Sequence, residues 1–225
     1  MIADLIQGGQ LPWADQIDLV ELPARQELHA QGAAVLHIHF PISALVILTQ
    51  ASASGVEVPV ALVGNDGVLG MAALMGVGTE THRAVVLHPG LAWRLPVEAV
   101  PDGGSNPAQV VRATMGHLLS LTSQIAQTAF CQQQHNVEQR LSRWLLTALD
   151  RLPETELAID LPELAPFLGV SDGALSRAAA SLVERGVLVR EPGRLAVPMR
   201  TALQAVSCGC HMATRGTCLS SLRQH

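Results

Sequence analysis

The stretch from residue 161 to residue 197 restricts the possible folds more than any other part of the chain. It begins as a short helix that should end at Gly169, because glycine commonly follows the last turn of a helix. A second helix is expected over residues 173–185, with leucine and alanine on its inner face and Gly186 at its end. Two short apolar runs around the turn at 191–194 then predict a hairpin. Helix, glycine turn, helix and hairpin is the order of a winged helix-turn-helix.

Two prolines fall in the first of these helices. Pro162 stands at its start, where proline is tolerated because the first turn has no partner for its missing N–H. Pro166 falls inside the helix, where a lost donor and a steric clash cost about 3 kcal/mol. We therefore expect this helix to be short or irregular.

The second helix begins with residue types that suit DNA. In a helix-turn-helix, the second helix lies in the major groove and contacts the bases with its first turns. Arg177 can bind both acceptors of a guanine, and Arg190 and Arg194, at the hairpin turn, are expected at phosphates. A basic winged helix that contacts proteins is the alternative. The candidate DNA-binding residues are Ser171, Asp172, Gly173, Ser176, Arg177, Arg190 and Arg194.

The charge is distributed unevenly along the chain. Residues 1–172 hold 7 arginines and 17 acidic residues, whereas residues 173–225 hold 7 arginines and 2 acidic residues. An acidic body with a basic end is typical of a small DNA-binding module joined to another domain.

The composition indicates a globular protein that works in the cytoplasm. The chain has 225 residues, of which 48% are hydrophobic and 15% charged, enough to bury a core in one or two domains. The start of the chain lacks the basic and apolar regions of a signal peptide, and no apolar run could span a membrane. Motifs of nucleophilic or phosphate-binding enzymes are missing, so we do not expect an enzyme.

The N-terminal hundred residues are typical of an antiparallel β-structure. Short apolar runs separated by Gly, Pro, Asn and Asp predict strands of a sandwich or jelly roll, and residues 65–67 predict a turn. The clearest break in the chain is residues 101–107. The predicted strands are Val35–Phe40, Ala44–Leu48, Val56–Val63 and Arg83–Leu87.

A long helix without proline is expected to follow, from Ala108 to a break near residues 135–138. Its apolar residues recur every seven positions, as in a helix that packs against a partner helix. Packing against its own domain would give a similar stripe. The candidate dimer-helix residues are Val111, Leu118, Leu121 and Ile125.

Several of these segments together resemble the Crp/Fnr transcription regulators. The C-terminal match runs from Val137-Glu138-Gln139-Arg140-Leu141 through Leu168-Gly169-Val170-Ser171 to Glu184-Arg185-Gly186-Val187-Leu188. Upstream, residues 39–44, 61–71 and 82–86 resemble the β-roll of the same family.

This resemblance implies an α+β protein of three parts. Residues 1–105 would form a cyclic-nucleotide-binding-like β-roll (a jelly roll), residues 106–136 a dimerisation helix, and residues 137–225 a winged helix-turn-helix with a C-terminal tail. It implies a homodimer on a pseudo-palindromic operator in double-stranded DNA, with RNA polymerase as a further partner.

The segment that binds cyclic AMP in members of this family differs here. Those members carry a Glu for the ribose and an Arg-Ser pair for the phosphate, but Val68 takes the Glu position and the later segment reads His82-Arg83-Ala84. We therefore expect an effector other than cyclic AMP; an effector-independent DNA binder with a vestigial sensory domain is the alternative. The candidate effector-pocket residues are Val68, Leu69, Gly70, His82 and Arg83.

Two groups of possible metal ligands remain. His37 and His39 lie on one face of a strand, so a metal-dependent, cupin-like enzyme is another alternative, although residues 40–48 hold no acid to complete that motif. Cys208, Cys210, His211 and Cys218 could bind zinc, but their spacing is not that of a standard zinc finger. We expect free thiols and no metal, and the sequence requires no cofactor.

Overall fold

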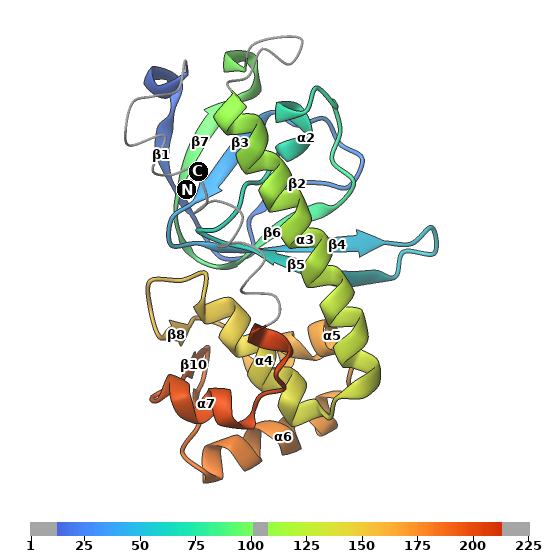
Figure 1. Ribbon diagram of the computed structural model, residues 1–225, viewed down its shortest axis with the longest axis vertical. Coiled ribbons are helices and arrows are strands. Elements are labelled where there is room, and N and C mark those ends of the chain that lie inside the picture. The colour runs from blue at the N-terminus through green and yellow to red at the C-terminus, as the bar shows by residue number, and fades with distance from the viewer. Residues whose placement is uncertain (1–12, 101–107, 213–225) are drawn as a thin grey trace.

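The computed structural model describes residues 13–100 and 108–212. Figure 1 shows strands gathered in the upper half and helices in the lower half, with the long helix α3 (Ala108–Gln134) running along both. None of the helices in the described ranges has the length and hydropathy that crossing a membrane requires.

The strands of the upper half form two antiparallel sheets, with strand orders β1-β7-β3 and β2-β6-β4-β5. Short helices stand beside them: η1 (Ala14–Gln16), α2 (Met71–Leu74) and η2 (Val97–Ala99). The strands are β1 (Asp18–Leu22), β2 (Glu27–His29), β3 (His37–Pro41), β4 (Leu45–Ala51), β5 (Glu57–Val63), β6 (Arg83–His88) and β7 (Gly90–Pro96).

The residues of β4 alternate between two cores. Val46 and Leu48 point into the roll, among the apolar residues that the sheets enclose. Leu45 and Ile47 point outward and join the core of the helical half. Successive side chains of a strand face opposite sides of the sheet. Both faces of β4 are therefore buried, which agrees with its run of apolar residues without alternating polar ones.

The edge of the four-stranded sheet is closed by a side chain of α3. The Gln124 amide accepts a hydrogen bond from the Leu62 N–H at 3.0 Å and donates one to the Leu62 carbonyl at 3.1 Å. Both backbone groups of this edge residue are therefore satisfied without another strand.

The turn after β5 lies against both halves. A Cβ atom at Gly67 would lie 2.4 Å from the His117 ring of α3, and one at Gly64 would lie 2.6 Å from the Arg151 Cβ. Asp66, between these glycines, pairs with Arg151 at 3.0 Å. The turn therefore requires glycine at both positions to reach the two halves at once.

The helix break expected near residues 135–138 is present. Helix α3 ends at Gln134, and α4 (Val137–Leu149) begins with a capping box. The Asn136 side chain accepts from the Gln139 N–H at 2.9 Å, and the Gln139 side chain accepts from the Asn136 N–H at 3.2 Å. These reciprocal bonds start a new helix in place of a continued one.

The lower half contains the predicted helix-turn-helix and hairpin. The first helix is split into a 3₁₀ turn, η4 (Leu161–Leu164), and a single turn, α5 (Ala165–Leu168), each with a proline near its start. Pro166 thus lies at a helix start, which explains the irregular first helix. The remaining elements are β8 (Glu156–Leu157), α6 (Asp172–Glu184), β9 (Val189–Glu191), β10 (Arg194–Ala196) and α7 (Arg200–Val206).

Candidate functional site

Helix α6 presents a polar face to solvent at its N-terminal end. Gly169 before it has a φ of +60°, and the Ser171 hydroxyl caps the helix by accepting from the Ala174 N–H at 3.4 Å. Leu175, Ala179 and Leu182 are buried in the core below. The exposed residues of the first turns are Ser171, Asp172, Gly173, Ser176 and Arg177, which are the candidates expected from the sequence.

Arg177 is exposed and makes no ion pair with any residue that the structure describes. A Cβ at Gly173 would lie 3.7 Å from its guanidinium, so that this side chain lies back along the first turn of the helix. Its donors are therefore free for a partner in front of α6.

The hairpin β9–β10 holds its two arginines differently. Arg190 is exposed and has no ion pair among the described residues. Arg194 hydrogen-bonds Glu156 and lies 3.5 Å from Glu191, and the Glu156 carboxylate raises the pKa of its guanidinium. Arg194 is therefore placed at the hairpin as expected, but two carboxylates already hold it.

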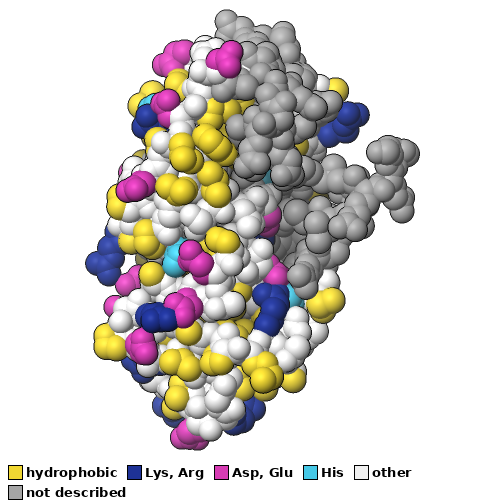
Figure 2. Space-filling model, turned by 90° about the vertical axis from the view of Figure 1, so that its left-hand side faces the viewer, with side chains coloured by type: hydrophobic (Ala, Val, Ile, Leu, Met, Phe, Trp, Pro, Cys, Tyr) yellow, Lys and Arg dark blue, Asp and Glu magenta, His cyan; other side chains and the backbone are white. Residues whose placement is uncertain are grey.

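Other arginines of the lower half are also paired. Arg185 contacts Glu138 of α4, and Arg200 contacts Asp150 at the end of α4. Figure 2 shows this mixture on one face of the molecule, where arginines of the lower half stand beside acidic side chains. The excess of arginine after residue 172 is thus partly neutralised, mostly by carboxylates that precede it in the sequence.

The β-roll contains a cavity of about 190 Å³ that faces α3. Of the candidate effector-pocket residues, Val68, Leu69, Gly70 and His82 line it, and Arg83 does not. The other lining residues, which the sequence did not indicate, are His29, Leu48, Met71, Glu80, Thr81, Leu118, Leu121, Thr122 and Ile125.

The polar side chains of the described cavity lining are His29, Glu80, Thr81, His82 and Thr122, among which Glu80 is the carboxylate. His29 Nδ1 lies 3.1 Å from the His82 carbonyl oxygen, and burial, the largest cause, lowers the pKa of His29. Its Nε2 is buried with no hydrogen-bond partner among the described residues. The Glu80 carboxylate accepts from the Ala72 N–H at 3.0 Å. The described lining contains no arginine, so a phosphate would lack a fixed cation there.

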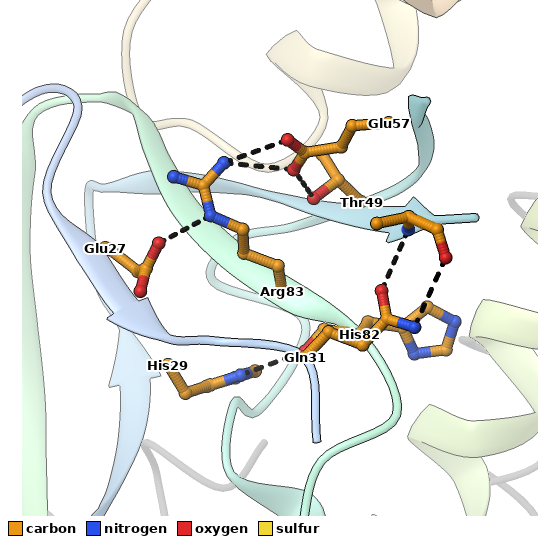
Figure 3. A network of polar contacts seen from close by, with 8 residues as sticks. Glu27, His29, Gln31, Thr49, Glu57, His82 and Arg83 are labelled. Atoms are coloured by element: carbon orange, nitrogen blue, oxygen red, sulfur yellow. Dashed lines mark hydrogen bonds and ion pairs between the residues drawn. The ribbon is translucent and has the colours of Figure 1, made fainter. Parts of the chain in front are cut away.

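Arg83, expected at this pocket, belongs to a network on the outside of the roll (Figure 3). Its guanidinium binds Glu27 at 2.5 Å and Glu57 at 3.0 Å. A hydrogen bond from Thr49 is the largest cause that lowers the pKa of Glu57, and a hydrogen bond from Arg83 is the next largest. Neighbouring residues of a strand point to opposite faces of the sheet. The carboxylates of Glu27 in β2 and Glu57 in β5 hold the Arg83 side chain on the outer face of β6.

Helix α3 has one buried and one exposed side. Leu121 packs into the β-roll and is only 9% exposed, so it is not available to a partner helix. At Leu121, the seven-residue repeat of apolar residues reflects packing of α3 against its own β-roll. The large exposed apolar residues of α3 are Val111, Met115, Leu118, Leu119, Ile125 and Phe130, which include the other three dimer-helix candidates.

His37 and His39 lie on the same face of β3, with ring centroids 6.2 Å apart. Burial, followed by the charges of His37 and Arg94, lowers the pKa of His39 to about 4. Among the residues that the structure describes, no group of three or more metal-ligand side chains includes this pair. The geometry gives no support to a metal-dependent enzyme built on them.

The C-terminal cysteines meet a different histidine from the one expected. His211 lies 2.7 Å from an Asp150 oxygen, and Cys218 lies outside the described residues. Cys208 and Cys210 instead lie beside Cys131 and His135 at the end of α3. Cys131 and His135 are four positions apart, a spacing on a helix that could have indicated this pair. The sequence does not show that the pair meets the distant segment that holds Cys208 and Cys210.

Solved structures of low sequence identity share this architecture. No protein-family model matches the sequence, and no curated protein sequence does either. FixK2 from Bradyrhizobium japonicum aligns with a TM-score of 0.69 and 14% identity, over 86% of this chain and 98% of that one. TTHA1359, a Crp/Fnr-family transcriptional regulator from Thermus thermophilus, aligns with a TM-score of 0.64 and 16% identity, over 84% and 98%.

A third structure, the global regulator CLP of Xanthomonas campestris, described as responsive to c-di-GMP, aligns with a TM-score of 0.60 and 16% identity, over 81% of this chain and 94% of that one. These alignments cover β-roll, long helix and winged helix-turn-helix together, and they confirm the predicted fold class. The chain therefore has the fold of the Crp/Fnr transcription regulators.

Proposed function

We propose that this chain is a sequence-specific DNA-binding transcription regulator that acts as a homodimer. The observation that carries the proposal is the exposed start of α6: among the residues that the structure describes, neither Arg177 there nor Arg190 of the β9–β10 hairpin pairs with a carboxylate. A guanidinium free in this position can bind guanine with two hydrogen bonds, and Arg190 can bind phosphate. No catalytic function enters the proposal, and we infer that the protein works in the cytoplasm.

The exposed apolar side of α3 supports the dimer. Residues Val111, Met115, Leu118 and Ile125 are spaced by three, four and seven, as in a helix that packs along a partner. A second copy on this side would cover side chains that are 37–58% exposed in the single chain. The two α6 helices would then meet successive major grooves, about 34 Å apart, on a pseudo-palindromic site. RNA polymerase is the further partner that we propose.

We further propose that the cavity binds an effector that is not a cyclic nucleotide. Its lining is largely apolar, and Val68 and Arg83 do not supply the carboxylate and cation that ribose and phosphate need. Leu118, Leu121 and Ile125 of α3 form one wall, so that a bound molecule would touch the helix that carries the dimer contact. The turn at Gly64–Gly67 lies next to this wall and contacts Arg151. A shift of the wall on effector binding would therefore be transmitted through this turn to the winged helix.

The proposal is tested by selecting duplexes from a random DNA library with the purified full-length protein. We expect a two-fold symmetric site to be enriched. Arg177→Ala should reduce discrimination at one base pair of each half-site by about 1–3 kcal/mol. Arg177→Lys keeps the charge but loses the bidentate contact with the base. It should therefore retain its affinity for non-specific DNA and lose the preference for the selected sequence.

Arg94→Ala is the matched control, because it removes the same charge from β7, far from α6, where Arg94 pairs with Asp18. It should leave the selected sequence unchanged. Enrichment that is the same in Arg177→Ala as in the unchanged protein, or no DNA binding at low salt, would contradict the proposal. Weak, salt-dependent binding without enrichment of any sequence would indicate that specific binding requires an effector.

A further inference from the structure

Three cysteines and one histidine come together where α3 meets the segment after α7. Cys131 and His135 lie one turn apart at the end of α3, and Cys208 and Cys210 follow α7 directly. One ligand atom from each of the four lies within 4.8 Å of all the others. These residues are separated in sequence by up to 79 positions, so their convergence is a property of the fold.

The distances in this cluster agree with those of a tetrahedral metal site. Zinc binds sulfur at about 2.3 Å and nitrogen at about 2.0–2.1 Å, so two sulfurs lie about 3.8 Å apart and a sulfur and a nitrogen about 3.6 Å apart. Here the Cys131 and Cys208 sulfurs are 4.0 Å apart, and His135 Nε2 lies 3.2 Å from the Cys210 sulfur. These two distances differ from the tetrahedral values by a few tenths of an ångström, and the other distances in the cluster are at most 4.8 Å.

The burial of the ligands suits a structural site. Cys131 is 1% and Cys208 6% exposed, whereas His135 and Cys210 are half-buried and leave an entrance for an ion. The Gln127 amide donates a hydrogen bond to the Cys131 sulfur at 3.7 Å, and the Phe130 ring packs against the edge of the His135 ring. Contacts of this kind fix the orientation of ligands around metals.

The four residues also decide which metal fits. Three sulfurs and an imidazole with no carboxylate exclude the oxygen-binding cations magnesium and calcium. Four protein ligands leave no open position, as in structural zinc sites. A disulfide would join only two of the three cysteines and would leave the third cysteine and His135 without a function.

From this convergence we propose that Cys131, His135, Cys208 and Cys210 bind one zinc ion per chain. The ion connects the last turn of α3 to the segment after α7, across the break between α3 and α4. It therefore holds the winged helix against the long helix. This site is independent of DNA binding, and its test requires no DNA.

The test is a titration of metal-free, reduced full-length protein with Zn²⁺ in competition with a chromophoric chelator, repeated with Co²⁺ to record the absorption of a tetrahedral thiolate complex. We expect one ion per chain and a rise in melting temperature on binding. Cys210→Ser and His135→Gln should each weaken binding by at least about 100-fold, because even residues that only support a ligand are worth 10–100-fold. Both side chains are partly exposed, and circular dichroism of the metal-free variants is the check that they fold.

Cys218→Ser and His211→Gln are the controls, because they change the same residue types at positions to which the proposal assigns no ligand. Both should bind zinc like the unchanged protein. The proposal is overturned if the unchanged protein binds no zinc, or if Cys210→Ser and His135→Gln bind it undiminished. It is also overturned if the two controls lose the ion, or if the anaerobically purified protein holds an iron–sulfur cluster at these cysteines.

Discussion

Two arginines of the β-roll end on carboxylates of neighbouring strands, whereas two arginines of the winged helix end in solvent among the residues that the structure describes. Arg83 contacts Glu27 and Glu57, and Arg94 contacts Asp18. Arg177 and Arg190 have no such partner among the described residues. Three of the five described arginines beyond residue 172 are nevertheless paired, namely Arg185, Arg194 and Arg200.

This difference shows that the net charge of a region overstates the charge that a ligand meets. The excess of arginine after residue 172 points to DNA, but only the arginines without carboxylate partners can contribute fully to binding. The β-roll adds a second contrast, because it also buries neutral histidines.

Acidification from about pH 7.5 to about pH 5 should remove about 4 kcal/mol from the free energy of unfolding, through His39 and His117. Burial, the largest cause for each, lowers the pKa of both rings to about 4. Between the unfolded pKa near 6.5 and this folded value, the unfolded chain binds more protons, so stability is present above the window and is lost as the pH falls through it. Urea unfolding at the two pH values measures the loss.

In that experiment, His117→Gln should remove about half of the loss that His39 and His117 cause together. Asp66 and Arg151 face His117, whereas His37, Arg94 and His29 face His39, so the two rings should act independently. An unfolding free energy that is the same at both pH values would show that these rings are hydrated in the folded state.

Arg190→Ala should weaken DNA binding at all sequences alike and lower the salt dependence. Each phosphate contact contributes about one to the slope of log K against log salt, so a dimer should lose about two. Fluorescence anisotropy with a fixed duplex at several salt concentrations measures the slope. A slope that does not change would place Arg190 away from the DNA.

Arg194→Ala should lower that slope by less than Arg190→Ala does, because Glu156 and Glu191 already neutralise Arg194. Glu156→Gln, which removes one of these carboxylates, should strengthen DNA binding a few-fold at low salt and less at high salt. Equal effects of Arg190→Ala and Arg194→Ala would break the distinction between free and paired arginines.

Arg83→Ala should have the smallest effect, a loss of at most about 1 kcal/mol in the free energy of unfolding, because exposed ion pairs contribute little. The Arg83 side chain is 39% exposed and lies outside the cavity. DNA binding should not change. A change in DNA affinity without loss of stability would show that the outer network of Figure 3 contributes to function.

The local signals in the sequence predicted most of the fold. Gly169, Ser171 and Gly186 stand at helix boundaries in the structure, and Pro166 produced the short first helix as expected. Apolar runs predicted strands that begin and end within three residues of β3, β4, β5 and β6. Strands β1, β2 and β7 were not predicted, because their residues alternate weakly and pair with distant partners.

The site could be predicted only where it is local. The start of α6 lies on one helix, so spacing alone placed Ser176 and Arg177 together. Arg83 was expected in the cavity, and which side of β6 it occupies depends on carboxylates from β2 and β5. Leu121 fits both a dimer contact and a domain contact, and only the structure separates them. Partners that are far apart in sequence decide each of these cases.

The double-sided strand β4 has a consequence for unfolding. Leu45 and Ile47 belong to the same core as Leu145 and Leu175 of the helical half, so neither half encloses its apolar residues alone. Pulling the winged helix away would expose these side chains, at about 25 cal/mol for each square ångström of apolar surface. The two halves should therefore melt in one cooperative transition, and truncation of Ile47 should lower the melting temperature of the winged helix as well as that of the roll.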